Sequence, residues 1–191
     1  MMKRSWMVAI VLSILVSLLL TGCVTTNGGG LPNGSGNPAQ PVQKAPEQAP
    51  NNNVETVPVK VYFGTHDARY VVAETHKIKK DGMLMQRAME ILVGGPKKAE
   101  LVPVVPPGTK VKSVTVKERT AFVDFSGELI KRGFGSSSME ILTVGAIVNT
   151  LTEFPDVEKV QILVEGKKVS TLFGHLDVSD PLSRSPGIIK K

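Results

Sequence analysis

The chain has 191 residues, with 23 lysines and arginines against 17 aspartates and glutamates, so its formal charge at pH 7 is +6. This length leaves room for one modest domain. The basic residues are scattered and do not alternate with aromatic ones, which argues against nucleic-acid binding. An aromatic content of 5% also argues against a cleft that stacks sugars.

The first 22 residues predict an export signal. Lys3 and Arg4 precede an uncharged run from Ser5 to Leu20, which is too short for a comfortable bilayer span but typical of a signal peptide. The segment Leu20-Thr21-Gly22-Cys23 resembles the lipobox of bacterial lipoproteins, whose cysteine receives a diacylglyceryl group before the peptide is cut ahead of it. We therefore expect Cys23 to be lipidated. An uncleaved signal anchor and a cleaved protein with an incidental Cys23 are the alternatives.

Residues 23–56 predict a tether behind this anchor. Two acyl chains on Cys23 would hold the protein at the cell membrane almost permanently, whereas one chain gives only marginal binding. The stretch after the cysteine is rich in Gly, Asn, Pro, Gln, Ser and Ala, so it has too little apolar surface to offset the entropy of ordering. Because Cys23 is the only cysteine, an intrachain disulfide and a cysteine zinc site are excluded.

The folded part begins with two strands and a helix. Apolar residues alternate from Val57 to Phe63, which predicts a half-buried strand with Pro58 near its start or edge. A second β-rich run covers Tyr70 to Ile78. Asp81 offers an N-cap to a helix that reaches about Val93, and Gly94-Gly95-Pro96 ends it, because glycine adopts the left-handed cap and proline cannot continue the helix. The apolar face of this helix is expected to contain Leu84, Ala88, Ile91 and Leu92, with Met85 and Met89 beside them.

Two more strands follow a proline-rich connection. They cover about Lys110 to Val116 and Thr120 to Phe125, and we expect a hairpin although its turn, Glu118-Arg119, lacks Asn-Gly or Asp-Gly. The proline-rich segment Val104 to Thr109 is either a recognition ledge or a rigid crossover.

A second helix and a last pair of strands complete the pattern. Ser137 and Glu140 form a capping-box pattern that opens a helix to about Phe154. Val160 to Val164 predicts a strand, with a hairpin partner at Lys168 to Phe173. The stripe that this helix is expected to bury consists of Ile141, Val144, Ile147, Val148 and Leu151.

The order of elements predicts an α+β fold. Because each helix has one apolar stripe and the strands alternate, the economical packing is a single domain with a mixed sheet of about five or six strands and two helices on one face. We expect this domain to span residues 57–182 and residues 183–191 to form a flexible tail.

Four segments, in this order, resemble the GerMN domain of bacterial lipoproteins, a domain of sporulation and spore germination. They are Ile91–Pro96, Val105–Val111, Val123–Ser126 and Asn149–Val157, and the last leads into Val160–Gly166. The resemblance covers roughly residues 57–182. It implies a ring-building-motif-like fold, similar to modules of secretion-like channels. It also implies a non-enzymatic, membrane-tethered domain on the extracytoplasmic face of the cell membrane.

The resemblance further implies a role in assembling a cell-envelope or sporulation and germination complex. The expected partners are the membrane, through the lipid on Cys23, and envelope proteins, with self-association as an open alternative. No cofactor, metal or nucleic acid is expected. This sequence has one copy of the domain where the sporulation protein has two, which leaves a general envelope role open. The alternative function is a binding module for a cell-wall glycan or small ligand, and an enzyme comes third.

Few residues offer catalytic or metal-binding chemistry. His66, His76 and His175 lie on different predicted elements without HExxH spacing, so we expect exposed structural histidines. His66 and the adjacent Asp67 are too few ligands to argue a metal site. Asp124 is expected on the exposed side of its strand, hydrogen-bonded near Ser126 and Gly127, without a carboxylate partner for glycoside hydrolysis.

Two glycine-containing segments also have simple structural interpretations. Gly133-Phe134-Gly135-Ser136 does not match GxSxG, so it predicts a loop and a helix cap, not a nucleophile elbow. The segment from Gly94 to Lys98 lacks GxxxxGK[ST] spacing and follows a helix, where carbonyl groups point outward. It therefore predicts a C-cap and no anion site.

Overall fold

A computed structural model describes residues 55–191 of the chain. The predicted signal peptide, Cys23 and nearly all of the predicted tether lie outside the described residues. Within residues 55–191, no helix is long and apolar enough to cross a bilayer.

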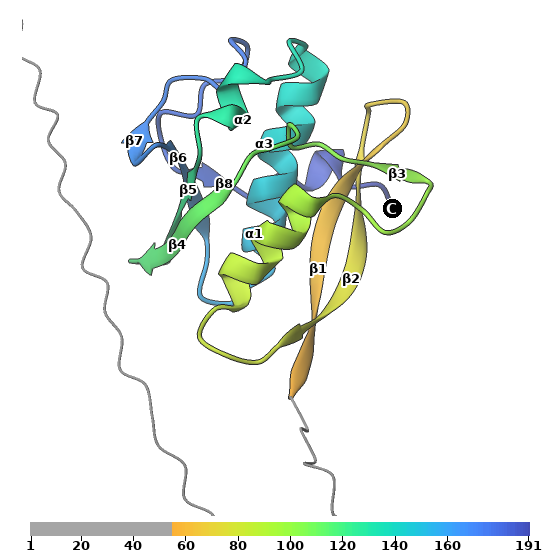
Figure 1. Cartoon of the computed structure of the whole chain (residues 1–191), viewed down its shortest axis with the longest axis vertical. Helices are drawn as coiled ribbons and strands as arrows, with labels where there is room; N and C mark the ends of the chain where they lie inside the picture. The colour runs from red at the N-terminus through yellow and green to blue at the C-terminus, as the bar shows by residue number, and fades with distance from the viewer. Residues whose placement is uncertain (1–54) are drawn as a thin grey trace, which may run out of the picture. The chain divides into compact units, whose positions relative to one another are not determined.

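The first sheet is built on a long hairpin (Figure 1). Strand β1 (Thr56–Thr65) pairs antiparallel with β2 (Val71–Lys79) on one side and with the short β3 (Leu101–Val102) on the other, in the order β2-β1-β3. The two long strands confirm the sequence prediction. Strand β3 was not expected, because it occupies only two residues inside the proline-rich connection.

The second sheet holds the remaining strands: β4 (Val111–Lys117), β5 (Thr120–Phe125), β6 (Lys159–Val164), β7 (Lys167–Lys168) and β8 (Leu182–Ser183). Their order is β4-β5-β6-β7, and β8 pairs with β6. Strands β5 and β6 are parallel, and the other pairs are antiparallel. The sheet is therefore mixed, as expected.

The α+β class is confirmed, but the strands form two sheets and not one. The reason lies at the edge of β1 that faces away from β2. There the Tyr62 N–H donates to Thr150 Oγ1 at 3.1 Å, so a helix side chain, and not another strand, takes the main-chain donor. Helices α1 (Leu84–Gly94) and α3 (Ser137–Leu151) join the two sheets, since both contact β1, and α1 also contacts β4 while α3 contacts β6.

The helices are α1 (Leu84–Gly94), the single turn α2 (Glu128–Lys131) and α3 (Ser137–Leu151). Helix α1 starts later than predicted. Asp81 Oδ1 accepts the N–H of Met83 at 3.0 Å, in the turn that precedes the helix. The glycine cap is confirmed, because Gly95 has φ of 87° and its N–H donates to the carbonyl of Leu92.

The capping box expected from Ser137 and Glu140 is wrong. The N-cap is Ser136, whose Oγ accepts the N–H of Met139 at 3.2 Å. Glu140 therefore lies one residue beyond the position from which a glutamate reaches back to the cap. The helix also ends at Leu151, one turn before Phe154.

Helix α3 lies at the centre of the core. Every residue from Leu142 to Leu151 is buried, so the helix is enclosed on all sides instead of presenting one stripe. Four of the five residues of the predicted stripe are buried, but Ile141 is 43% exposed. Because Glu140, one residue earlier, is fully buried, the exposure of Ile141 follows from the side of the helix on which it lies.

The predicted hairpin between β4 and β5 is confirmed. Its turn residues Glu118 and Arg119 have φ of 49° and 59°, which is the left-handed pair that a two-residue hairpin loop requires, here without glycine. The strand expected at Lys168 to Phe173 is much shorter, because β7 ends at Lys168.

The last residues differ from the expected flexible tail. Leu182 and Ser183 pair with β6, a 3₁₀ turn covers Pro186–Ile188, and Ile189 forms a parallel bridge with Val71. The segment stays against the domain because Ile188 and Ile189 pack against the core. We call residues 182–191 the C-terminal strap.

Candidate functional site

The structure does not bring the predicted site residues together. Cys23 lies outside the described residues. His66 Nε2 lies 3.3 Å from the carbonyl of Ala99, and His175 is exposed on a loop. His76, expected to be exposed, is only 5% exposed on β2. Within residues 55–191, no group of three His, Cys, Asp or Glu residues is placed to hold a metal ion.

His76 lies beside a buried carboxylate. Its Nε2 is 2.6 Å from Glu74 Oε1, although this approach is too bent to count as a hydrogen bond. The same carboxylate accepts the N–H groups of Lys97 and Lys98, at 3.2 and 2.9 Å. These N–H groups are therefore occupied by a carboxylate of the protein itself, and the absence of a site for an external anion after α1 stays a prediction.

The hydrogen bonds to Glu74 set its charge state. Burial alone would raise the pKa of this carboxyl, but the N–H groups of Lys98 and Lys97, with His76 beside them, outweigh burial and lower the pKa below its usual range. Glu74 is thus an ionised residue that ties the loop after α1 to β2.

Glu140 has a similar role at the other end of the core. Its side chain is fully buried and accepts the N–H groups of Leu172 and Phe173 at 2.8 Å and of His175 at 2.7 Å. Burial alone would raise the pKa of Glu140, but these donors lower it. The loop that follows β7 therefore bends toward α3 instead of continuing the hairpin.

The segment Gly133 to Ser136 is a loop and a helix cap, as predicted. At Gly133 a Cβ atom would lie 2.4 Å from the Phe173 ring, so the absence of a side chain lets the two loops meet. Phe134 packs edge-on against the same ring, with centroids 6.2 Å apart. Asp124, expected to be exposed, is only 9% exposed, and its Oδ1 accepts the N–H of Gly166 at 2.8 Å.

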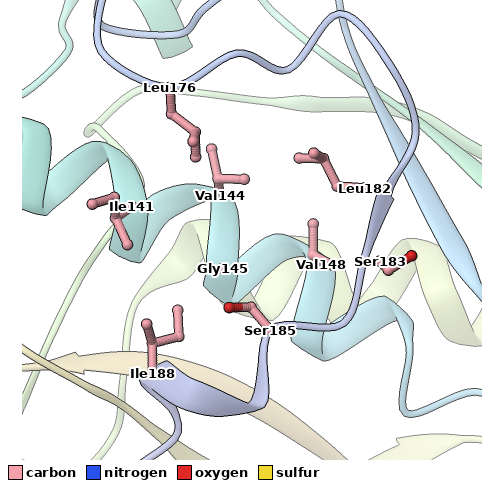
Figure 2. Close-up of a pocket in the computed structure, with 9 residues that line it drawn as sticks. All are labelled: Ile141, Val144, Gly145, Val148, Leu176, Leu182, Ser183, Ser185 and Ile188. Atoms are coloured by element: carbon pink, nitrogen blue, oxygen red, sulfur yellow. The ribbon is translucent and has the colours of Figure 1, made fainter.

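An apolar groove lies between α3 and the C-terminal strap (Figure 2). Its cavity volume is about 260 Å³. Figure 2 shows Val144 and Val148 of α3 facing Leu176, Leu182 and Ile188 across it. We call this feature the α3 groove. Its lining consists of Ile141, Val144, Gly145, Val148, Leu176, Leu182, Ser183, Ser185 and Ile188.

Asn149 fixes one wall of the α3 groove. This residue is fully buried, and its side-chain amide donates to the Ser185 carbonyl at 3.0 Å and accepts the Ser185 N–H at 2.9 Å. Both main-chain groups of one strap residue are therefore bonded to one side chain of α3, which sets the register of the strap along the helix.

Arg184 holds the strap beside the same wall. Its guanidinium donates to the carbonyl of Asn149 at 3.0 Å and to the hydroxyl of Tyr62 at 2.8 Å, and it pairs with the carboxylate of Glu153. Tyr62 in turn donates to Glu153 at 2.7 Å. Burial would raise the pKa of Glu153, but Tyr62 and Arg184 lower it, so the carboxylate stays charged. This latch links β1, α3 and the strap.

The chemistry of the α3 groove favours binding over catalysis. The side chains that line it are aliphatic apart from two serines, and none of them is titratable. A general acid, a general base or an activated nucleophile needs a titratable neighbour within hydrogen-bond reach. The groove as lined can therefore accept apolar groups, but it offers them no proton transfer.

A second, more open groove lies between the start of α1 and β4. Its cavity volume is about 530 Å³, and its lining includes Met83, Leu84, Val114, Val116 and Phe154. Met83 and Val116 are 52% and 42% exposed. Unlike the α3 groove, this surface is mixed, because Asp81, Lys112 and Asp156 also line it.

Little in the sequence indicates which residues build these features. Glu74 and Arg184 belong to no motif, and Asn149, although it begins the family segment Asn149–Val157, has no neighbour in the sequence that indicates its partner. For Glu140 the available signal was a carboxylate in a helix whose other inward positions are apolar, but its spacing from Ser137 imitates a capping box.

Comparison with known proteins identifies the family. Residues 60–170 match the family model Germane, described as sporulation and spore germination. The spore germination protein GerM of Bacillus subtilis (strain 168) is 32% identical over 125 residues, which are 62% of this chain and 33% of GerM. The chain thus covers only a third of the length of that relative.

Solved structures agree with this match. The tandem GerMN domains of the sporulation protein GerM from Bacillus subtilis are 30% identical, with a TM-score of 0.59, over 68% of this chain and 46% of theirs. The first GerMN domain of that protein is 31% identical, with a TM-score of 0.59, over 68% of this chain and 98% of its own. A Clostridium perfringens protein, solved as a candidate lipoprotein, is 32% identical, with a TM-score of 0.51, over 70% of this chain and 91% of its own.

The family model spans more than half of the chain, and it covers the region in which the four sequence segments resemble the GerMN domain. The predicted resemblance is thereby confirmed. The relatives are sporulation and germination proteins of the GerM type. The chain belongs to the Germane family, and its folded part is a GerMN domain.

Proposed function

We propose that this protein is a lipoprotein anchored to the extracytoplasmic face of the cell membrane through Cys23. Its GerMN domain is a non-enzymatic interaction domain that binds an envelope protein and assists the assembly of a cell-envelope or sporulation and germination complex. The family supports the sporulation and germination context, and the lipobox-like segment ending at Cys23 supports the anchor.

The observation that carries the binding role is where the exposed apolar side chains lie. Among the described residues, the most exposed large hydrophobic side chains are those of Met83, Val116, Ile130, Phe134 and Ile141. Met83 and Val116 flank the open groove beside β4, while Ile130, Phe134 and Ile141 lie on α2, the following loop and the first turns of α3. Three of them line apolar parts of a groove, Ile141 in the α3 groove and Met83 and Val116 in the open groove. Exposed apolar side chains that form a continuous surface mark interaction sites more often than scattered single residues do.

The alternative, a module for a cell-wall glycan or small ligand, has less support. Such sites are usually pockets that enclose most of the ligand and place a few polar groups to orient it. The α3 groove has a volume of about 260 Å³, and serines are the only polar side chains in its lining. An apolar protein segment fits this lining better than a sugar does, because sugar hydroxyls would be left without partners.

The test compares two exposed apolar positions in the full chain. Ile141→Lys adds a charge at the α3 groove, and Met83→Lys adds the same charge at the open groove, so each variant is the matched control of the other. Because both side chains are about half exposed, neither change should unfold the protein. Each variant is produced from the native locus, and its rescue of the deletion phenotype is compared with the wild type.

The proposal requires that one of these variants accumulates normally, stays folded and fails to rescue. A photo-crosslinking residue placed at that position in the otherwise wild-type chain should then yield one defined crosslinked envelope protein. In a second protein, the crosslinking residue stands at a neighbouring position and the lysine substitution should abolish the crosslink. Full rescue by both lysine variants would contradict the assignment of either groove as the interface. Loss of rescue in a folded histidine variant would instead point to the third reading, an enzyme.

A further inference from the structure

The solvent face of the β1–β2 hairpin carries a row of lysines. In the antiparallel register, Thr56 lies opposite Lys79, Pro58 opposite Lys77 and Lys60 opposite Thr75. All six residues are exposed, and each cross-strand row holds one lysine and no carboxylate. We call the surface formed by Lys60, Lys77 and Lys79 the basic face.

Nearby carboxylates do not neutralise this face. Lys60 lies 3.5 Å from Glu153, but Glu153 also pairs with Arg184 in the latch. Asp81 interacts electrostatically with Lys79, but its carboxylate forms a 2.9 Å salt bridge with Arg87.

The charges of Lys80 and Glu55, which lie next to the basic face, cancel each other. Lys80 and Glu55 form a 2.6 Å pair at the end of the hairpin. Within residues 55–191, Lys77 and Lys79 make no salt bridge, and Lys60 shares its partner with an arginine. The basic face therefore has an excess of about three positive charges.

The rest of the chain joins the domain at this face. Thr56, the first residue of β1, lies directly opposite Lys79, and 54 residues precede Glu55. Figure 1 shows the start of β1 and the end of β2 together at one end of the hairpin, with the C-terminus toward the other. If Cys23 is the anchor, the domain is attached to the membrane by the end that carries the basic face.

From the charge excess and the attachment point we infer that the basic face docks on an anionic lipid surface. This inference deepens the proposed function, because it rests on a membrane anchor at Cys23. The exposed side of a strand pair is a broad surface, and lysine stems can extend their ammonium groups toward phosphate headgroups. Each lysine close to an anionic bilayer contributes roughly a fivefold increase in partitioning, so three contribute on the order of 100-fold.

A simpler explanation exists for this pattern. Strand β2 is an edge strand, and lysines on edge strands discourage pairing with other chains. This explanation applies to Lys60 as well, because within residues 55–191 β3 pairs with β1 only at Gly64 and Thr65 and leaves the far edge of β1 without a strand beside Lys60. The two explanations differ in one measurable property, since a protective lysine row need not bind any membrane.

The experiment uses residues 49–191 as a separate protein. Its described residues, 55–191, belong to one compact unit, and the corresponding first GerMN domain of the relative was solved by itself. Binding is measured by co-sedimentation with phosphatidylcholine vesicles and with vesicles that contain phosphatidylglycerol. The test protein carries Lys60→Gln, Lys77→Gln and Lys79→Gln. The control carries Lys159→Gln, Lys167→Gln and Lys168→Gln, which remove the same charge from exposed positions of the second sheet.

We expect the wild type to bind only the anionic vesicles and to lose this binding as salt is raised. The basic-face variant should bind on the order of 100-fold more weakly, and the control variant should change by less than about fivefold. Equal losses in both variants would overturn the inference, because they would show a general charge effect. Absence of wild-type binding to anionic vesicles would overturn it as well.

Two further measurements separate the inference from its alternatives. If soluble poly(glycerol phosphate) binds the basic face while anionic vesicles do not, the ligand is a wall polymer and the lipid assignment is wrong. In cells, the full chain with the three basic-face substitutions should remain in the membrane fraction through its lipid anchor. Loss of the anchor by Cys23→Ala tests the proposed function alone, since vesicle binding by residues 49–191 does not involve Cys23.

Discussion

A Cβ atom on Gly145 would lie 2.0 Å from Cδ1 of Ile188, so the strap packs against α3 at a point where only glycine leaves room. Gly145 sits in the middle of a helix, where glycine costs about 1 kcal/mol relative to alanine. The strap therefore fills the space left by the missing side chain of Gly145, although glycine at this position lowers the helix propensity of α3.

This contact predicts a coupling between the two positions. Gly145→Ala alone should give little stabilisation or a net loss, because the new methyl group displaces the side chain of Ile188. In an Ile188→Ala background the same substitution should stabilise the domain by up to about 1 kcal/mol, as expected for an unobstructed helix site. Denaturant unfolding of the four proteins of this cycle measures the coupling, which should reach about 0.5 kcal/mol or more. If Gly145→Ala is equally stabilising in both backgrounds, the strap does not dock as described.

Glu140→Gln should destabilise the domain by about 2 kcal/mol, because the charged acceptor of three buried or half-buried N–H groups becomes a neutral one. The pKa of Glu140 is lowered in the folded state. Its contribution is thus complete above the ordinary glutamate value of 4.5 and is lost as the pH falls through the lower folded value.

The stability difference between the wild type and Glu140→Gln should consequently be constant near neutral pH and shrink in acid. Thermal unfolding between pH 7 and pH 3 checks this prediction. A difference that grows as the pH falls would mean that Glu140 is protonated in the folded protein.

Leu151→Ala should be among the most damaging substitutions in α3. The side chain is fully buried, and truncating a buried leucine to alanine typically costs about 2 to 5 kcal/mol. Ile141→Ala is the matched control on the same helix, and it should cost less than about 1 kcal/mol because Ile141 is 43% exposed. Urea denaturation of both variants measures the change in the free energy of unfolding. Similar decreases in the two variants would contradict the exposed position of Ile141.

Cys23→Ala should prevent lipid attachment and signal cleavage, because the thiol is the expected acceptor and the processing peptidase of this pathway acts on the modified cysteine. Metabolic labelling with a fatty acid, combined with detergent partitioning, measures both effects. A variant that still appears as a mature-length, acylated species would contradict the anchor.

The local elements could be predicted because each rests on neighbouring residues. Alternation along β1 and β5 depends on which side chains share a face, and the end of α1 depends on the backbone freedom of Gly95, whose φ is 87°. The family segments are contiguous as well, which is why the GerMN resemblance could be recognised before the structure was known.

The features that shape the candidate site depend on distant residues. Glu140 looked like a capping residue because its local spacing fits that role, but the fold gives it three N–H donors from a loop more than 30 residues away. The strap looked like a tail because nothing adjacent to it orders it. Asn149 and Arg184 order it from α3 and across to β1.

By itself the sequence thus determined the two long helices, the longer strands, the α+β class and the family, since these follow from local propensity, periodicity and motif order. Only the tertiary structure decided that the strands divide into two sheets, that Ile141 borders a groove and that the strap closes against Gly145. The physical reason is that these groups are buried by, and hydrogen-bonded to, residues that are far away in the chain. A local sequence pattern does not specify which distant residues will be in contact.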